Sequence, residues 1–82
     1  MTNVQELKVK IVSASGPLYD GKATAVSGFN KVGPFDILPM HENFISLISD
    51  KVIVHDGDDL EFKFERGLLE VTGNVVSVFV GI

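Results

Sequence analysis

Apolar and polar side chains alternate along two well-separated stretches of the chain. Residues 7–11 alternate apolar side chains with lysines, and residues 60–64 alternate them with Glu61 and Lys63. A strand with this pattern places one face on a core and the other in water. We therefore expect one inter-sheet core to contain Val9, Ile11, Leu60, Phe62 and Phe64.

Turn signals recur at short, regular intervals between such stretches, among them Gly16-Pro17, Gly33-Pro34 and Gly73-Asn74. Regular spacing of this kind predicts an all-β sandwich or barrel. Residues 75–80 are apolar almost throughout, which is typical of a strand covered on both faces. With 82 residues, 45% of them hydrophobic, the chain is long enough for one domain with one core.

One stretch favours a helix instead. Met40, Phe44, Leu47 and Ile48 follow the spacing of a helix face, and Pro39 would suit a helix start. The pattern alone therefore predicts a short amphipathic helix over residues 42–49.

Composition narrows the classes of partner. The net charge is -4 and the seven basic residues are scattered, which argues against nucleic acid. The chain has no cysteine, which favours a reducing compartment and hence the cytoplasm. Its apolar runs are too short to span a membrane, so we expect no direct membrane insertion.

The residues indicate no catalytic site. Neither a Gly-x-Ser-x-Gly elbow nor a Gly-rich phosphate loop is present, so we expect no enzyme activity, cofactor or small-molecule ligand. A Ser-His-Asp set could still assemble in space. The acidic run at residues 56–59 lacks the ligand spacing of a calcium loop and predicts a hairpin turn, not a metal site. His55 beside it is expected to be a half-exposed surface histidine.

Residues 33–42 predict a partner-contacting loop at one end of the domain. Glycine and prolines restrict its backbone, and it mixes apolar with polar side chains, as interfaces do. The candidate partner-binding residues are Gly33, Pro34, Phe35, Asp36, Met40, His41 and Glu42. The alternative is that Phe35, Ile37 and Leu38 close the end of the core and His41 is an ordinary exposed side chain.

Four stretches, in order, resemble the N-terminal β-sandwich domain of the epsilon subunit of F-type ATP synthase. They are residues 7–12 with 16–21 (Leu-Lys-Val-Lys-Ile-Val and Gly-Pro-Leu-Tyr-Asp-Gly), 33–41 (Gly-Pro-Phe-Asp-Ile-Leu-Pro-Met-His), 44–48, and 67–71 with 74–78 (Gly-Leu-Leu-Glu-Val and Asn-Val-Val-Ser-Val). The resemblance implies a sandwich of about ten strands in two antiparallel or mixed sheets. It also implies that residues 44–48 form a strand, which overrides the helix.

By the same resemblance the chain is a non-catalytic central-stalk subunit that binds the gamma subunit and the c ring and contributes to proton-driven ATP synthesis. Its place would be the cytoplasm, peripheral to the inner face of the energy-transducing membrane. The alternative is a free-standing β-sandwich adaptor unrelated to ATP synthesis.

The chain departs from the family pattern at four positions. Pro34 replaces an acidic residue, Asp36 and Met40 replace glycines, and Arg66 replaces the first of two paired glycines. The family's C-terminal helical hairpin has no counterpart in residues 1–82, so we expect one domain and carry over no regulatory role.

Overall fold

The computed structural model describes residues 6–81, which form seven strands and no helix. The strands are β1 (Leu7–Ser13), β2 (Gly16–Ala23), β3 (Ala25–Asn30), β4 (Gly33–Ile37), β5 (Phe44–Asp56), β6 (Asp58–Thr72) and β7 (Val75–Val80). The all-β prediction is confirmed. The count is seven, not about ten, in part because β5 and β6 are single strands of 13 and 15 residues.

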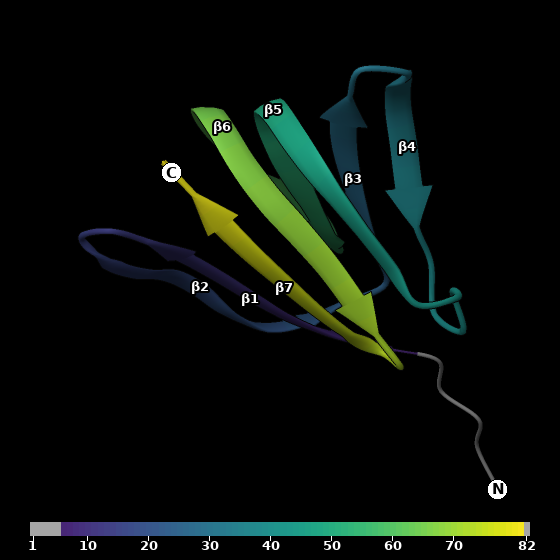
Figure 1. The fold of residues 1–82 in the computed structure, drawn as a ribbon. Coiled ribbons are helices and arrows are strands. Elements are labelled where there is room, and N and C mark those ends of the chain that lie inside the picture. Colours follow the sequence, from purple (N-terminus) through teal and green to yellow (C-terminus); the bar gives the residue numbers. More distant parts are fainter. Residues whose placement is uncertain (1–5, 82) are drawn as a thin grey trace, which may run out of the picture.

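The strands form one mixed sheet in the order β2-β1-β7-β6-β5-β3-β4. β1 and β7 are parallel, and every other pair is antiparallel. The β5–β6 ladder shifts register between Ser49 and Asp50, and Asp50 has a φ of 81°. Both long strands bend back at this irregularity (Figure 1). After its bend, β5 pairs with β3 through residues 53–55, and after its own bend β6 pairs with β7 through residues 67–72. Such irregularities increase the local bend of a sheet, and here the bend folds one sheet into two layers.

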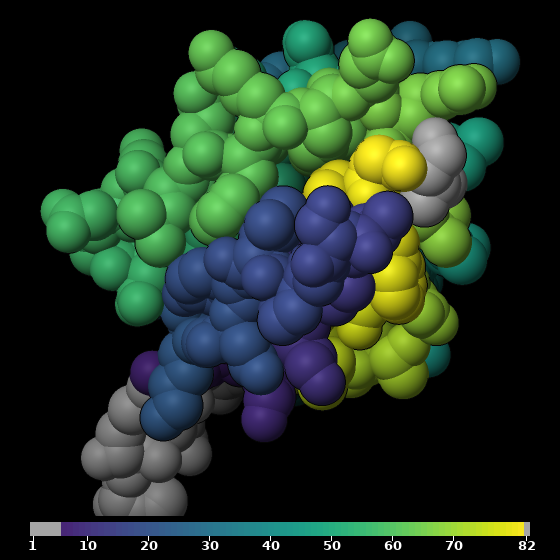
Figure 2. Space-filling view, turned by 90° about the vertical axis from the view of Figure 1, so that its left-hand side faces the viewer, coloured from purple at the N-terminus to yellow at the C-terminus, as the bar shows by residue number. Residues whose placement is uncertain are grey.

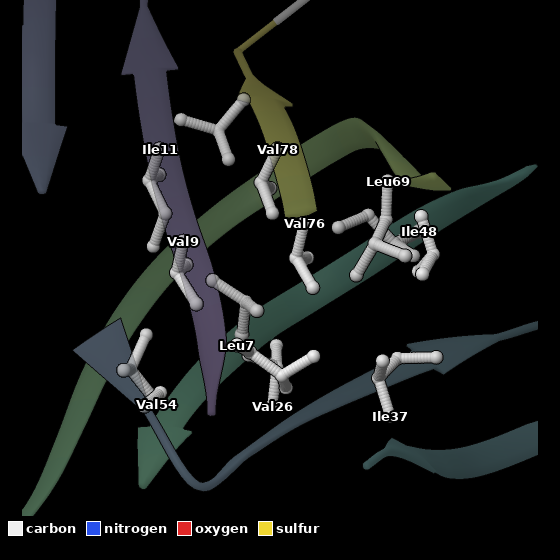
Figure 3. Close-up of a cluster of buried hydrophobic side chains, with 14 residues drawn as sticks. Leu7, Val9, Ile11, Val26, Ile37, Ile48, Val54, Leu69, Val76 and Val78 are labelled. Carbon is white, nitrogen blue, oxygen red and sulfur yellow. The ribbon is translucent and has the colours of Figure 1, made fainter. Parts of the chain in front are cut away.

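Contacts across the fold close the two layers on one another. The ring of Tyr19 on the edge strand β2 lies 6.0 Å, centre to centre, from that of Phe62 on β6. Just beyond β2, the backbone N–H of Thr24 donates to the carbonyl of His55 at 2.8 Å. The core between the layers is aliphatic (Figure 3), and no polar side chain of residues 6–81 is buried in it. Its fully buried members include Leu7, Val9, Ile11, Val26, Ile37, Val52, Val54, Leu69, Val71, Val76 and Val78.

The alternating stretches meet this core to different extents. Val9 and Ile11 are buried, as predicted, and Phe62 and Phe64 are half-buried against the cluster. The prediction is wrong for Leu60, whose side chain is 42% exposed. Leu60 lies close to the tip of the β5–β6 hairpin, which projects beyond β1 and β2 (green in Figure 2), so no second layer covers it.

Residues 44–48 form the start of β5, so the resemblance predicts this segment correctly and the helical spacing does not. Phe44 and Ile48 face the core while Ile45 and Leu47 are exposed. This is the alternation of a strand with one solvated face.

The acidic run is a hairpin turn, as predicted. β5 ends at Asp56 and β6 begins at Asp58, with Gly57 between them at a φ of 83°. Across residues 6–81, no group of three or more metal-ligating side chains lies together. Nor does that part of the chain contain a helix long and apolar enough to cross a bilayer.

Candidate partner-binding sites

The predicted partner-contacting loop is shorter than residues 33–42. Residues 33–37 form β4, which pairs with β3 along its whole length, so the prediction of a loop is wrong for them. Gly33 and Pro34 lie at one end of β4, beside the turn from β3. Met40 and the residues after it follow the other end (Figure 1). The remaining loop, residues 38–43, is called the end loop below.

The two middle residues of the predicted set point to opposite faces of β4. The ring of Phe35 packs inward on Gly28, where an added Cβ would lie 2.8 Å from Cζ of Phe35, and it meets the Phe44 ring edge-on at 5.4 Å. Phe35 therefore closes the end of the core. Asp36 points outward and accepts a hydrogen bond from the Ser27 hydroxyl at 2.6 Å.

The end loop begins with a tight turn. The backbone N–H of His41 donates to the carbonyl of Leu38 at 3.1 Å, with Pro39 and Met40 as the two central residues. Met40 has a φ of 70°, as the third position of a type II turn requires. Its side chain is 74% exposed, and that of Leu38 is exposed as well.

His41 is held locally. Its ring meets Phe44 edge-on at 5.7 Å, and its Nδ1 donates to the carbonyl of Glu42 at 2.7 Å. The side chain is half-buried, and that of Glu42 beside it is exposed. His41 is thus more than an ordinary exposed side chain, because its ring lies against the aromatic pair at the end of the core.

Two asparagines tie the end loop to the β6–β7 turn in a reciprocal pair of hydrogen bonds. Asn74 Oδ1 accepts the backbone N–H of Met40 at 2.8 Å, and Asn43 Oδ1 accepts that of Gly73 at 3.1 Å. The carbonyl of Asn74 also accepts the backbone N–H of Lys8 at 2.8 Å. The end loop, the turn and the start of β1 therefore form one fixed end of the domain.

A second exposed feature lies on the outer surface of the sheet. Residues directly opposite in register share a face, and apolar residues face each other across four successive strands. Leu47 on β5 pairs with Leu68, which pairs with Phe79, which pairs with Val12 on β1. Together with Ile45, on the same face of β5 as Leu47, these residues are called the outer apolar face below.

This face is open to solvent. Leu47 is 70% exposed, Ile45 63% and Phe79 40%. The expectation that residues 75–80 are covered on both faces is therefore wrong, since only the inward side chains of β7 are buried. A depression of about 320 Å³ lies beside Leu47, lined also by Ile48, Arg66 and Gly67. Exposed apolar surface of this kind makes the outer apolar face a candidate interaction site.

The structure also assembles a polar chain that sequence motifs did not locate. His55 Nδ1 lies 2.7 Å from Asp59 Oδ1, and its Nε2 lies 2.8 Å from Ser27 Oγ. Ser27 in turn donates to Asp36. The order of groups is that of a Ser-His-Asp triad. His55 and Asp59 are neighbours across the β5–β6 hairpin, but Ser27 is 28 residues from His55, so local spacing could not show that the serine belongs with them.

Comparison with known proteins defines the family. The family model for the β-sandwich domain of the ATP synthase delta/epsilon chain matches residues 6–81. The chain belongs to this family. Epsilon chains of ATP synthase from Xanthomonas are similar: that of Xanthomonas oryzae pv. oryzae (strain PXO99A) is 32% identical, and that of Xanthomonas campestris pv. campestris (strain B100) 35%, each over 77 residues. These alignments cover 90% of this chain and 55% of the relatives, so the chain spans about half their length.

Solved structures agree on the fold. A chain in the mitochondrial ATP synthase of Euglena gracilis (OSCP/F1/c-ring) superposes with a TM-score of 0.86 at 14% identity, covering 98% of this chain and 53% of that one. A chain in the central stalk and c-ring of the Tetrahymena thermophila enzyme gives a TM-score of 0.78 at 11% identity, covering 99% and 67%. The epsilon chain is a non-catalytic subunit of ATP synthase, in agreement with the absence of catalytic motifs from this sequence.

The departures of this epsilon-type domain from its family pattern fall at informative places. Arg66 is exposed at the bend of β6, whereas the retained Gly67 is buried. Met40, where the resemblance implies a glycine, adopts the left-handed conformation that glycine adopts most readily.

Proposed function

We propose that this epsilon-type domain is a central-stalk subunit of a rotary F-type ATP synthase that binds the gamma subunit through the outer apolar face and the c ring through its fixed end. In this role it contributes to proton-driven ATP synthesis from the cytoplasmic side, peripheral to the inner face of the energy-transducing membrane. The observation that carries the proposal is the row of apolar side chains on the outer surface of four strands, in which Ile45, Leu47 and Phe79 are exposed and Val12 and Leu68 are half-buried.

The outer apolar face supports a permanent protein partner. An interface core is apolar with a polar rim, and here Ile45 pairs with Glu70, which stands in register with Ser77 and then Lys10. A polar row thus borders the apolar one. The face is built on paired strands, so little conformational entropy is lost when a partner covers it.

The fixed end supports a second contact. Met40 and Glu42 are exposed there and His41 is half-exposed. Asp36 is exposed on the outer side of β4, while Gly33, Pro34 and Phe35 shape that strand and its packing. Both structural relatives were solved in assemblies described as containing a c-ring. The seven predicted residues therefore divide into contact residues and residues that hold the contact surface.

Binding of the domain to purified gamma subunit and to purified c ring in detergent tests the proposal. Leu47→Asp is expected to weaken binding to gamma at least about tenfold, as loss of a buried interface anchor does. Its urea unfolding midpoint should stay close to that of the wild type, since Leu47 is exposed.

Leu60→Asp is the matched control, because it changes another exposed leucine at the tip of the β5–β6 hairpin. It is expected to bind gamma like the wild type. A wild-type domain that binds neither gamma nor the c ring would refute the proposal and favour a free-standing adaptor.

A further inference from the structure

Met40 combines backbone strain with exposure. Within residues 6–81 two non-glycine residues have a positive φ, Met40 at 70° and Asp50 at 81°. Asp50 lies at the bend of β5, and aspartate tolerates this conformation better than most residues. Methionine lacks the short polar side chain that makes a positive φ easier for aspartate. Backbone strain of this kind persists where the surrounding structure imposes it.

Asn74 imposes the conformation. Its side-chain oxygen accepts the Met40 N–H at 2.8 Å, and its own carbonyl is fixed by the N–H of Lys8. Asn43, in the end loop, adds a second hydrogen bond to the β6–β7 turn by accepting the backbone N–H of Gly73. The hydrogen bonds thus join the end loop to a rigid part of the sheet and hold the Met40 backbone in place.

The position would suit a glycine, which adopts positive φ without a Cβ penalty. A methionine there costs stability and gains no burial, because its side chain is 74% exposed. Exposed Leu38 lies two residues before it, so the tip of the loop presents two flexible apolar side chains. Methionine adapts well to apolar surfaces of irregular shape.

We propose that Met40 is the anchor side chain of the end loop in its contact with the c ring, and that Asn74 is the positioning residue that aims it. This inference rests on the proposed function and assigns the binding energy of that contact to one residue. Asn74 itself acts through the backbone of Met40.

The Met40→Gly variant distinguishes a role of Met40 in binding from a role in stability. It relieves the strain, so the urea unfolding midpoint is expected to rise or stay level, while binding to the c ring in detergent micelles falls at least about tenfold. Met40→Leu keeps an apolar side chain and is expected to bind within about threefold of the wild type. A Met40→Gly domain that binds the c ring like the wild type would overturn the anchor role.

Asn74 variants test the positioning. Asn74→Ala removes the acceptor and is expected to speed hydrogen exchange of the Met40 amide at least about tenfold and to weaken c-ring binding, whereas Asn74→Asp keeps an acceptor and should restore both. Unchanged exchange in Asn74→Ala would refute the positioning role. If the wild type itself fails to bind the c ring, the proposed function and the anchor fall together, while the exchange result still decides whether Asn74 holds the loop.

Discussion

Gly67 lies so close to the neighbouring strand that a Cβ added to it would sit 2.7 Å from the carbonyl oxygen of Phe79. Since that oxygen belongs to the backbone of β7, it cannot swing aside as a side chain would. Gly67→Ala must therefore push β6 and β7 apart, and we expect it to lower the free energy of unfolding by about 1–3 kcal/mol. Urea denaturation followed by circular dichroism measures the change.

Two substitutions serve as controls. Gly28→Ala also meets an obstacle, but this is the ring of Phe35, which can move. We expect it to cost less than Gly67→Ala. Arg66→Ala changes the exposed neighbour and should alter stability by no more than about 0.5 kcal/mol. Equal effects of Gly67→Ala and Arg66→Ala would show that the close approach to Phe79 is unimportant.

Core side chains should differ sharply in their contribution to stability. Ile11 is fully buried between the layers, so Ile11→Ala is expected to cost about 2–5 kcal/mol. Leu60 is 42% exposed near a hairpin tip, and Leu60→Ala should cost less than about 1 kcal/mol. Similar losses in the two variants would mean that the hairpin tip is packed as tightly as the centre.

Alternation along the sequence located the inward face of β1 but not the bend of the long strands. In β6 the inward residues are even-numbered up to Phe64 and odd-numbered from Gly67 onward, because the ladder skips Glu65 opposite the step from Ser49 to Asp50. A bulge of this kind depends on both strands of a ladder. The alternation of β6 read by itself therefore does not show that its two halves belong to one strand. The helical spacing has another cause: Phe44 and Ile48, four residues apart, share the inward face of β5, whereas Leu47 lies on its exposed face.

The candidate site, too, could be predicted only in part from the sequence. The end loop could be expected from Pro39 and its mixed side chains, but the reach of β4 could not, since pairing with β3 extends it to residue 37. Neither asparagine was among the predicted residues. Asn43 and Asn74 are far apart in sequence, and their importance comes from backbone N–H groups that only the fold brings near. The outer apolar face was likewise hidden, because its members are contributed one or two at a time by four strands.

Stability at alkaline pH should depend on Tyr19. Burial, and secondarily the negative charge of Asp56, raise the pKa of Tyr19 above its ordinary value, and its hydroxyl donates to the carbonyl of Lys22 at 2.9 Å. The folded chain thus favours the protonated phenol. The stability that the protonated phenol gives the folded state is fully present below about pH 10, the ordinary pKa of tyrosine. It is lost as pH rises through the pKa of Tyr19 in the folded state.

The Tyr19→Phe variant has no group that can ionise at this position, so its stability at alkaline pH is the control for that of the wild type. Between pH 9 and pH 11 the urea midpoint of the wild type should fall more steeply than that of Tyr19→Phe. Parallel curves would contradict the assignment. A spectrophotometric titration of this single tyrosine gives the same test directly.

The Ser27, His55 and Asp59 chain should be inert as a nucleophile despite its triad-like order. A catalytic serine passes its proton to the histidine, so the imidazole nitrogen facing it must accept. Here the Ser27 hydroxyl donates to the Asp36 carboxylate at 2.6 Å, which leaves Oγ as the acceptor toward His55 Nε2. The serine proton therefore points to a carboxylate and not to the imidazole. We therefore expect a fluorophosphonate serine probe to leave the domain unlabelled, and Ser27→Ala to leave p-nitrophenyl acetate hydrolysis at the background rate of the wild type. Labelling of Ser27 would mean that its proton reaches His55 after all, because only then does the oxygen become a competent nucleophile.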